Sequence, residues 1–276
     1  MRRPRLADVV AVVVAVGGVA GGTAGCDVGS LSVTIAGSEA AVGSSSGPLE
    51  DGASVGFSSI VVALDDVTVA ARAGDVAALV DEPFLVDVSS TEPRTIARVD
   101  VPAGAYERVS VVVAPAEPGL SAANVDEAVA ALMVQESFSV FVQGRIQAGG
   151  ASTSFSWGFS PNTRYVDCVD DAEAPGVVVV AQRETTLDLV VRGEGLFATS
   201  LSPQATTRSA AAILAADVND DDVIDLAELE AVDLEGVDEL DVAGRTDVIT
   251  LADFVSARAG ALLGLGARGR CVAERR

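Results

Sequence analysis

From residue 57 to residue 191 the chain is a succession of short segments in which every second residue is apolar. Alternation of this kind places one face of a β-strand in a core and the other face toward solvent. Gly, Pro, Asp and Ser, which are common in turns, separate the segments. About nine such strands with one-faced alternation indicate a mainly β fold, an antiparallel β-sandwich.

We expect this sandwich to be Ig-like or transthyretin-like. A first strand precedes the series at residues 31–35, and a Gly- and Ser-rich loop at residues 37–54 separates it from the rest. One helix interrupts the series at residues 121–134, with Ser121 as its expected N-cap. The expected strands of the series begin at residues 57, 67, 84, 96, 106, 138, 155, 177 and 187.

Residues 217–228, DVNDDDVIDLAE, carry side-chain oxygens at loop positions 1, 3, 5, 9 and 12. Position 7 can add its backbone carbonyl, and position 8 is apolar. Ca²⁺ prefers about six to eight oxygen ligands, and a final Glu can supply two of them. The spacing resembles the calcium loop of EF-hand and dockerin-type proteins, which implies Ca²⁺ as a cofactor. Its ligands would be Asp217, Asn219, Asp221, the Val223 carbonyl, Asp225 and Glu228.

Position 6 of this loop departs from the EF-hand pattern, because Asp222 stands where the pattern has Gly. Asp tolerates a left-handed backbone better than most residues do, but here it also adds a negative charge to a crowded loop. The alternative interpretation of residues 217–228 is therefore an acidic, solvated turn between two helices.

The sequence VIDLAEL at residues 223–229 recurs 25 residues later as VITLADF at residues 248–254. The resemblance to EF-hand pairs implies a short strand pairing between Ile224 and Ile249. The second loop lacks acidic ligands at its first positions. We therefore expect a small α-helical, EF-hand-like module over residues 205–263, with one binding loop and one degenerate loop, followed by a C-terminal tail at residues 264–276.

The chain contains no His and no Lys, and its net charge is −22. Without His, Ser-His-Asp and Cys-His catalysis and most zinc sites are excluded; without Lys, so are Schiff-base and P-loop chemistry. An acidic surface attracts cations and repels polyanions, so we expect no nucleic-acid partner. Carboxylates remain as possible catalytic groups of a glycosidase. The candidates near strand ends are Asp65, Asp66, Asp167, Asp170 and Asp171.

Residues 1–25 resemble an export signal, because three Arg among the first five residues precede an apolar run at residues 9–19 that is too short to span a bilayer comfortably. The run leads to TAGC at residues 23–26, which resembles the lipobox of bacterial lipoproteins, although Thr23 replaces the usual Leu. The resemblance implies cleavage before Cys26 and a lipid on Cys26. The chain would then be anchored to the membrane of the bacterial cell envelope, at its periplasmic face or outer surface. An ordinary secretory signal or an uncleaved anchor is the alternative.

The two other cysteines of the chain are Cys168 and Cys271. An even pair in an oxidising compartment favours a disulfide, and we predict a bond between them. Two unpaired thiols are the alternative.

A second resemblance covers about residues 30–115. An alternating strand with a central acidic step at residues 57–69 is followed by Val-Asp-Val at residues 86–88 and by VPAGAYERV at residues 101–109. This order resembles bacterial lipoproteins that carry domain of unknown function 4382. The resemblance implies an exported β-domain and implies no activity. From the strand pattern as a whole, we expect the β-sandwich domain to cover residues 26–200.

These observations favour a non-enzymatic, lipid-anchored envelope protein in which Ca²⁺ fixes a helical module against a β-sandwich. One alternative is a binding module for a cell-surface polysaccharide or a partner protein, with Trp157 as a sugar-stacking platform instead of a core residue. A carboxylate-based glycosidase is the third hypothesis. The run GLGARG at residues 264–269 matches a dinucleotide-binding motif by letter only, because it does not follow a strand that opens a βαβ unit.

Overall fold

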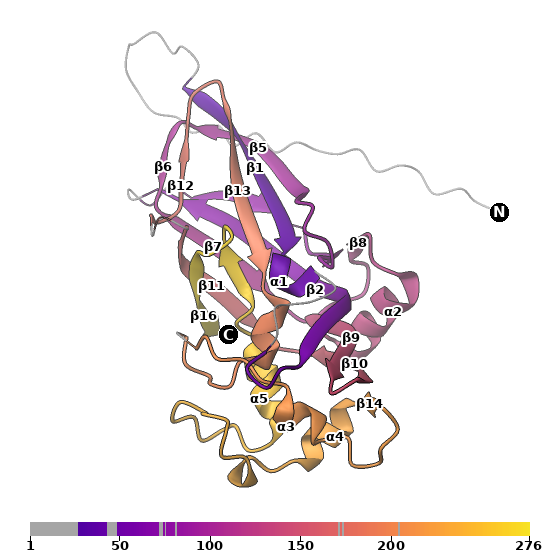
Figure 1. Cartoon of the computed structure of the whole chain (residues 1–276). Helices are drawn as coiled ribbons and strands as arrows, with labels where there is room; N and C mark the ends of the chain where they lie inside the picture. The colour runs from indigo at the N-terminus through magenta and orange to yellow at the C-terminus, as the bar shows by residue number, and fades with distance from the viewer. Residues whose placement is uncertain are drawn as a thin grey trace, which may run out of the picture.

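The computed structural model of the chain is mainly β, with 47% strand and 17% helix (Figure 1). It describes residues 27–42, 49–71, 74, 76–80, 82–170, 172, 174–203 and 205–276. The expected export signal, Cys26 and Asp171 therefore lie outside the described residues. Within the described part, no helix has the length and apolar character needed to cross a membrane.

The smaller of two principal sheets has the strand order β15-β13-β1-β5. Strand β1 (Val28–Gly37) is antiparallel to β5 (Arg94–Pro102) and parallel to β13 (Glu184–Val191). Strand β15 (Leu263–Leu265) pairs with the other side of β13. Alternate residues of the two central strands are buried and apolar, as the sequence pattern predicts: Leu31, Val33, Ile35, Leu187, Leu189 and Val191.

The larger sheet is built around strand β2 (Ser54–Ala70), which has 17 residues. The first half of β2 pairs with β9 (Val140–Ala148), and its second half pairs with β7 (Arg108–Val113). Register shifts lie in both pairings and bend β2, as β-bulges do, so that one strand serves two neighbours in succession.

The main path of the larger sheet is β14-β10-β9-β2-β7-β11-β16, and three further strands pair beside β2 or β4. Its other strands are β10 (Ala151–Phe159), β11 (Thr163–Val169), β14 (Val223–Ile224), β16 (Arg270–Arg275), β3 (Val76–Val80), β4 (Phe84–Asp87) and β8 (Ser121–Ala123). A separate pair joins β6 (Gly104–Tyr106) to β12 (Val177–Val179).

Three pairings among the described strands are parallel, namely β1 with β13, β4 with β8, and β10 with β14. The expectation of an antiparallel arrangement is therefore wrong at these pairings. Parallel neighbours need a long connection, and more than a hundred residues separate β1 from β13. Sequence alternation gives the faces of a strand but not the direction of its partner.

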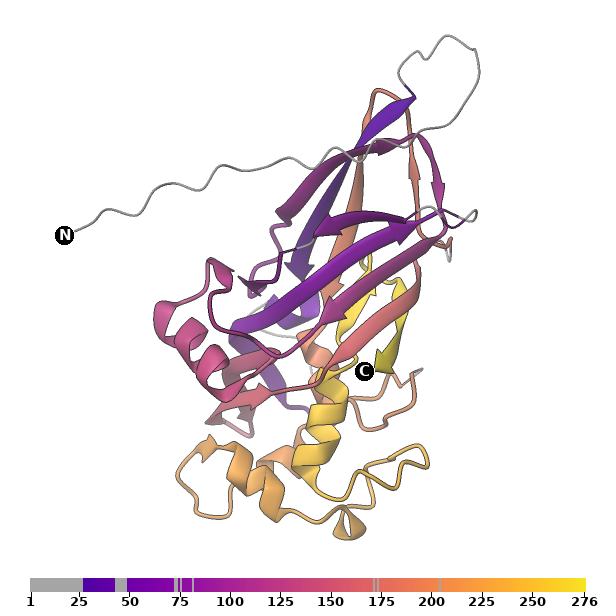
Figure 2. The same ribbon diagram turned by 180° about the vertical axis from the view of Figure 1, so that it is seen from behind.

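The two principal sheets share one apolar core, and Figure 2 shows the long strand of one sheet lying across the other. Trp157 of β10 is fully buried in this core and stacks on Phe155, with ring centroids 4.4 Å apart. The interpretation of Trp157 as a core residue is confirmed, and the sugar-stacking alternative is excluded because no ring face of Trp157 reaches solvent.

Helix α2 (Glu127–Glu136) covers part of the outer face of the larger sheet, where Met133 packs against Phe141 and other apolar residues. The expected N-cap, Ser121, is wrong, because Ser121 belongs to β8. The carboxylate of Asp126 caps the helix instead and accepts hydrogen bonds from the N–H groups of Ala128 and Val129.

The helical part lies below the sheets in Figure 1 and contains α3 (Ala211–Leu214), α4 (Leu226–Ala231) and α5 (Leu251–Ala259). Apolar residues of all three helices join the same core as the sheets. The segment expected as a C-terminal tail contains β16 and the end of β15, which pair with β11 and β13. The remaining short helices are α1 (Glu39–Val42), η1 (Gly193–Phe197) and η2 (Leu234–Gly236).

The predicted disulfide is confirmed, because Cys168 of β11 is bonded to Cys271 of β16. The two residues are 103 positions apart. The bond therefore joins the last two strands at one edge of the larger sheet, and links the end of the chain to a strand from its middle.

We predict that Cys271→Ser lowers the free energy of unfolding by about 2–5 kcal/mol, because the bond closes a long loop in the unfolded chain. The measurement is guanidinium denaturation of the chain from Asp27 onward, followed by circular dichroism. Reductant should lower the wild-type midpoint to that of the variant and leave the variant unchanged. A wild-type midpoint that reductant does not move would contradict the prediction.

Candidate metal centre

The segment at residues 217–228 connects α3 to α4 and supplies β14, the edge strand of the larger sheet. Val223 is paired with Ser154 of β10, and Ile224 is paired with Phe155. The buried indole of Trp157 donates a hydrogen bond to the Ile224 carbonyl at 2.9 Å. The second half of the segment is therefore fixed by the sheet.

The expected strand pairing between Ile224 and Ile249 is wrong. Ile224 is fully buried against the sheet, whereas Ile249 is 60% exposed. Strand β10 pairs with β14, and Ile224 is buried in the same core cluster as Phe155 and Trp157 of β10, so the sheet takes the place of the second loop as its partner.

The first half of the segment is wound by hydrogen bonds from its own backbone. The Asp221 N–H group donates to the Asn219 Oδ1 atom at 3.0 Å and to the Asp217 Oδ1 atom at 3.3 Å. The Val223 N–H group donates to the Asp221 Oδ1 atom at 2.9 Å. Side chains at positions 1, 3 and 5 thus turn back over the same short stretch of backbone.

The backbone conformation at position 6 is left-handed, with a φ of 60° at Asp222, and Asp220 has a φ of 56°. The EF-hand pattern uses Gly at position 6 because this conformation strains other residues. Asp is among the few residues that adopt it with little cost. The departure at Asp222 therefore leaves the turn itself intact.

The last two acidic residues of the segment form a capping box at the start of α4. The Glu228 N–H group donates to the Asp225 Oδ1 atom at 2.9 Å, and the Asp225 N–H group donates to the Glu228 Oε2 atom at 3.0 Å. The other carboxylate oxygen of Glu228, Oε1, is buried and accepts no hydrogen bond within the described part of the chain. Burying a carboxylate oxygen without a partner raises the free energy of the folded state. A cation or a hydrogen-bond donor at this atom would remove that cost.

Five Asp and one Glu lie within these twelve residues, with no Arg among them. As placed, no three side chains of Asp, Glu, Cys or His gather closely enough to hold a metal ion anywhere in the described ranges. The carboxylates of the segment accept hydrogen bonds from its own N–H groups instead. Like charges at this density repel one another and favour any cation that comes between them.

The second repeat reproduces the helix start of the first, as the internal repetition predicts. Thr250 caps α5 and forms a capping box with Asp253. The carboxylate of Asp253 accepts hydrogen bonds from the Thr250 and Ile249 N–H groups, and the first of these is the main cause that lowers the pKa of Asp253.

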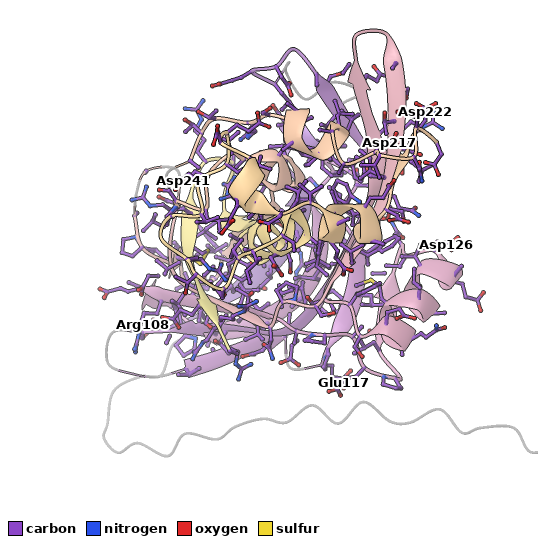
Figure 3. The ribbon with its side chains drawn as sticks, turned by 90° about the horizontal axis from the view of Figure 1, so that it is seen from below. Arg108, Glu117, Asp126, Asp217, Asp222 and Asp241 are labelled. Atoms are coloured by element: carbon purple, nitrogen blue, oxygen red, sulfur yellow. A yellow bond between two sulfur atoms is a disulfide. The ribbon has the colours of Figure 1, made fainter. Side chains whose placement is uncertain are left out.

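The carboxylates in and beside the second repeat's loop differ from those of residues 217–228, because they form hydrogen bonds or ion pairs with side chains of Arg and Ser. Arg245 donates to Asp247 at 2.6 Å, and this hydrogen bond is the main cause that lowers the pKa of Asp247 to about 2. Ser200 donates to Asp241 at 2.7 Å. Figure 3 shows Asp241 far across the helical part from Asp217 and Asp222. The carboxylates Asp241 and Asp247 thus already have side-chain partners within the protein.

Sequence reasoning found the loop but missed the contribution of Trp157. The sequence offers core packing or sugar stacking for its indole, whereas in the structure the buried indole also donates a hydrogen bond to the Ile224 carbonyl, 67 residues away in sequence. No local pattern gives this contact, because it depends on the register of β14 against β10.

Comparisons of this chain with protein-family models, with curated proteins and with solved structures find no match in any of the three. The resemblance of residues 30–115 to lipoproteins with domain of unknown function 4382 stays a prediction, as does the resemblance of residues 217–228 to EF-hand loops.

We predict that Trp157→Phe leaves the Ile224 carbonyl without its donor and lowers the free energy of unfolding by about 1–3 kcal/mol. Amide hydrogen exchange at residues 223–225 should accelerate more than exchange in the rest of the larger sheet. Phe159→Leu is the matched control, because it removes core packing and no hydrogen bond. Equal acceleration of residues 223–225 in both variants would show that packing alone holds the loop.

Proposed function

We propose that this chain is a lipid-anchored, non-enzymatic protein of the bacterial cell envelope. In this proposal the two principal sheets form the layers of a sandwich, and a Ca²⁺ ion at residues 217–228 fixes the helical part against it. The observation that carries the proposal is the Glu228 Oε1 atom, which is buried without a partner in the described structure at the position where an EF-hand loop places its last ligand.

The ligands in this proposal are the six expected from the sequence, Asp217, Asn219, Asp221, the Val223 carbonyl, Asp225 and Glu228. The hydrogen bonds that wind the loop are compatible with this role, because an ionised carboxylate has two oxygens and about four acceptor sites. Asp217, Asp225 and Glu228 each use one oxygen for a loop N–H group. The ion would supply positive charge between carboxylates that otherwise repel one another.

A structural role for Ca²⁺ fits the expected location outside the cytoplasm. Extracellular modules bind Ca²⁺ with dissociation constants of about 10⁻⁴–10⁻³ M. At a hundred times the dissociation constant, binding would stabilise the fold by about 2.7 kcal/mol. Because β14 is bonded to β10 and packed on Trp157, this stabilisation would reach the larger sheet directly.

Exposed apolar side chains near the start of the described chain support the proposed lipid anchor. Val28, Val178 and Val180 are exposed there, and the Val28 carbonyl accepts a hydrogen bond from the Gln182 N–H group. Cys26 precedes Val28 by two residues. Exposed apolar side chains beside a lipid-bearing residue would face the membrane surface at little cost.

The distribution of buried acids supports a non-enzymatic role over the glycosidase hypothesis. Among the described residues, Glu194 is the one acidic residue that is buried as a whole, whereas Glu228 is only partly buried. Glu194 accepts a hydrogen bond from Ser38 at 2.5 Å and lies 3.6 Å from Arg208. A glycosidase needs two carboxyl groups facing one cleft. The candidates Asp65, Asp66, Asp167 and Asp170 are not buried.

We predict that Ca²⁺ in excess raises the melting temperature of the wild-type chain by about 5–10 °C relative to chelator. Glu228→Gln should abolish most of this increase, because it keeps the shape and the capping group but removes the charge of the last ligand. Calorimetric titration should show one site, lost in Asp217→Ala.

Glu230→Gln is the matched control for Glu228→Gln, because Glu230 is exposed on the same helix and lies outside the loop. It should keep the full response to Ca²⁺. A wild-type melting temperature that is the same with Ca²⁺ and with chelator would remove the calcium part of the proposal.

We predict that Cys26→Ser releases the full chain from the membrane fraction of a bacterial host, because the lipid attachment site is lost. Metabolic labelling with a radioactive fatty acid should mark the wild-type chain and not the variant. A variant that stays in the membrane fraction, or a wild-type chain without label, would contradict lipid anchoring and favour an ordinary secretory signal or an uncleaved anchor.

A further inference from the structure

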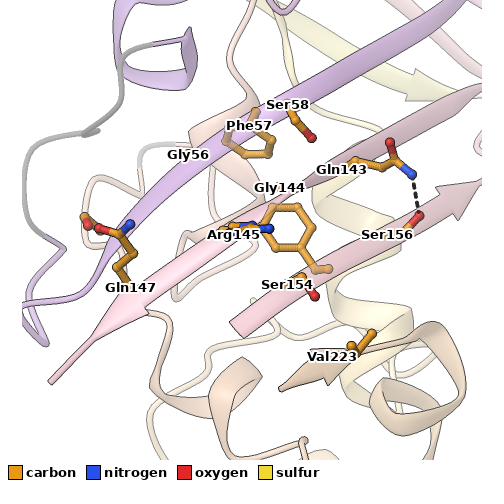
Figure 4. A pocket seen from close by; sticks show the side chains of 12 residues that line it. Gly56, Phe57, Ser58, Gln143, Gly144, Arg145, Gln147, Ser154, Ser156 and Val223 are labelled. Atoms are coloured by element: carbon orange, nitrogen blue, oxygen red, sulfur yellow. Dashed lines mark hydrogen bonds between the residues drawn. The ribbon is translucent and has the colours of Figure 1, made fainter. Parts of the chain in front are cut away.

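A hollow of about 510 Å³ lies on the outer face of the larger sheet, beside β14 (Figure 4). Its floor includes a row of paired residues from four successive strands: Gly56 of β2, Arg145 of β9, Ser154 of β10 and Val223 of β14. Strand pairing fixes this row, so its side chains emerge on the same face of the sheet. The hollow has a volume typical of sites for small ligands, about 300–1,000 Å³.

The charge in this hollow is unusual for the chain. The chain has 40 acidic and 18 basic residues, yet the lining contains one Arg and no carboxylate. Arg145 is exposed, and no described residue forms a hydrogen bond or an ion pair with its guanidinium group. By contrast, Arg98 and Arg245 pair with carboxylates.

Neutral polar side chains surround Arg145. Gln143 and Gln147 flank it along β9, and Gln143 donates a hydrogen bond to the Ser156 hydroxyl at 3.2 Å. Amide and hydroxyl groups both donate and accept hydrogen bonds, as the hydroxyls of a sugar do. The other polar residues of the lining are Ser54, Ser58 and Ser154.

Glycine at position 56 keeps the space beside Arg145 open. A Cβ atom added to Gly56 would meet nothing within 4 Å, so the backbone of β2 leaves room above the floor there. Two aromatic rings line the hollow: Phe155 is buried, and Phe57 is half-buried with its ring packed edge-on against Phe155 and Phe197. Phe57 can add an apolar contact, while hydrogen bonds and the charge of Arg145 would give the hollow its specificity for a ligand.

We propose that this hollow binds a polyhydroxy carboxylate with a single negative charge, such as a uronic acid sugar. The planar guanidinium group of Arg145 pairs with the carboxylate through two parallel hydrogen bonds. The Gln and Ser side chains bind the hydroxyl groups of the sugar. A net charge of −22 repels polyanions, so a ligand with one charge is favoured over a long acidic polymer.

The position of the hollow fits a ligand outside the cell. Figure 1 shows β14 and the adjoining ends of β9 and β10 at the end of the molecule opposite the start of β1. If the proposed lipid holds Cys26 at the membrane, the hollow faces away from it. The binding proposal itself needs neither the lipid nor the Ca²⁺ ion, because all four strands of the row belong to one sheet.

The test is a titration of the chain from Asp27 onward with D-glucuronate, observed through the ¹⁵N NMR signal of the Arg145 side chain. D-glucose is the uncharged match, and acetate is the carboxylate without hydroxyls. We expect glucuronate to bind about tenfold more tightly, or better, than either of them. The titration is done with Ca²⁺ and again with chelator, so that failure of this proposal and failure of the calcium proposal give different results.

Two variants separate the site from the fold. Arg145→Gln should weaken glucuronate binding about tenfold or more, and Gly56→Val should block the hollow without disturbing the core. Arg98→Gln, in an exposed ion pair on the smaller sheet, is the matched control and should bind as the wild type does. Equal affinity for glucuronate, glucose and acetate, or unchanged binding in Arg145→Gln, would overturn the proposal.

Discussion

The structure depends on the pairing of β2 with two different neighbours along its length. Its first half pairs with β9 and its second half with β7, so the larger sheet exists only if β2 stays continuous through both register shifts. Residues on both faces of its middle are buried, Ile60 and Val62 in the main core and Val61 and Ala63 beneath α2. A break in this strand would expose both clusters at once, so the sheet and its covering helix form as one cooperative unit.

The position of the loop at residues 217–228 in the helical part is fixed by the edge of the larger sheet. Strand β14 is two residues long, too short to be stable alone, and pairing with β10 together with the Trp157 hydrogen bond fixes it. A metal ion at this loop would therefore close a turn whose second half is already in place. Binding to a preformed loop costs less conformational entropy than binding to a disordered one, which favours a useful affinity at extracellular calcium concentrations.

The alternation of apolar residues predicted many of the strands, because burial of one face is a local property of sequence. It missed β3 and β11, and it divided β2 into two strands at the Asp65-Asp66 step. The starts of α4 and α5 depend on local sequence, because the capping groups Asp225 with Glu228 and Thr250 with Asp253 each act within one turn. The partners of the strands were not, since β1 finds β13 more than a hundred residues away and Ile224 finds Phe155 instead of the second repeat. The hollow around Arg145 was equally hidden, because four separate strands bring its residues together.

The loop and the hollow share Val223, and this proximity links their electrostatics. Strands in a sheet are about 4.8 Å apart and β10 lies between β9 and β14, so the backbone of Arg145 lies roughly 10 Å from β14. This separation is close to the Debye length of about 8–10 Å at 0.1–0.15 M salt. The acidic residues of the loop therefore oppose an anion at Arg145, and a divalent cation in the loop would cancel two of their charges. Each ligand would then favour the other by the same factor, as linkage requires. The interaction crosses solvent-exposed surface, so this coupling is small compared with the direct pairing of Arg145 with a carboxylate.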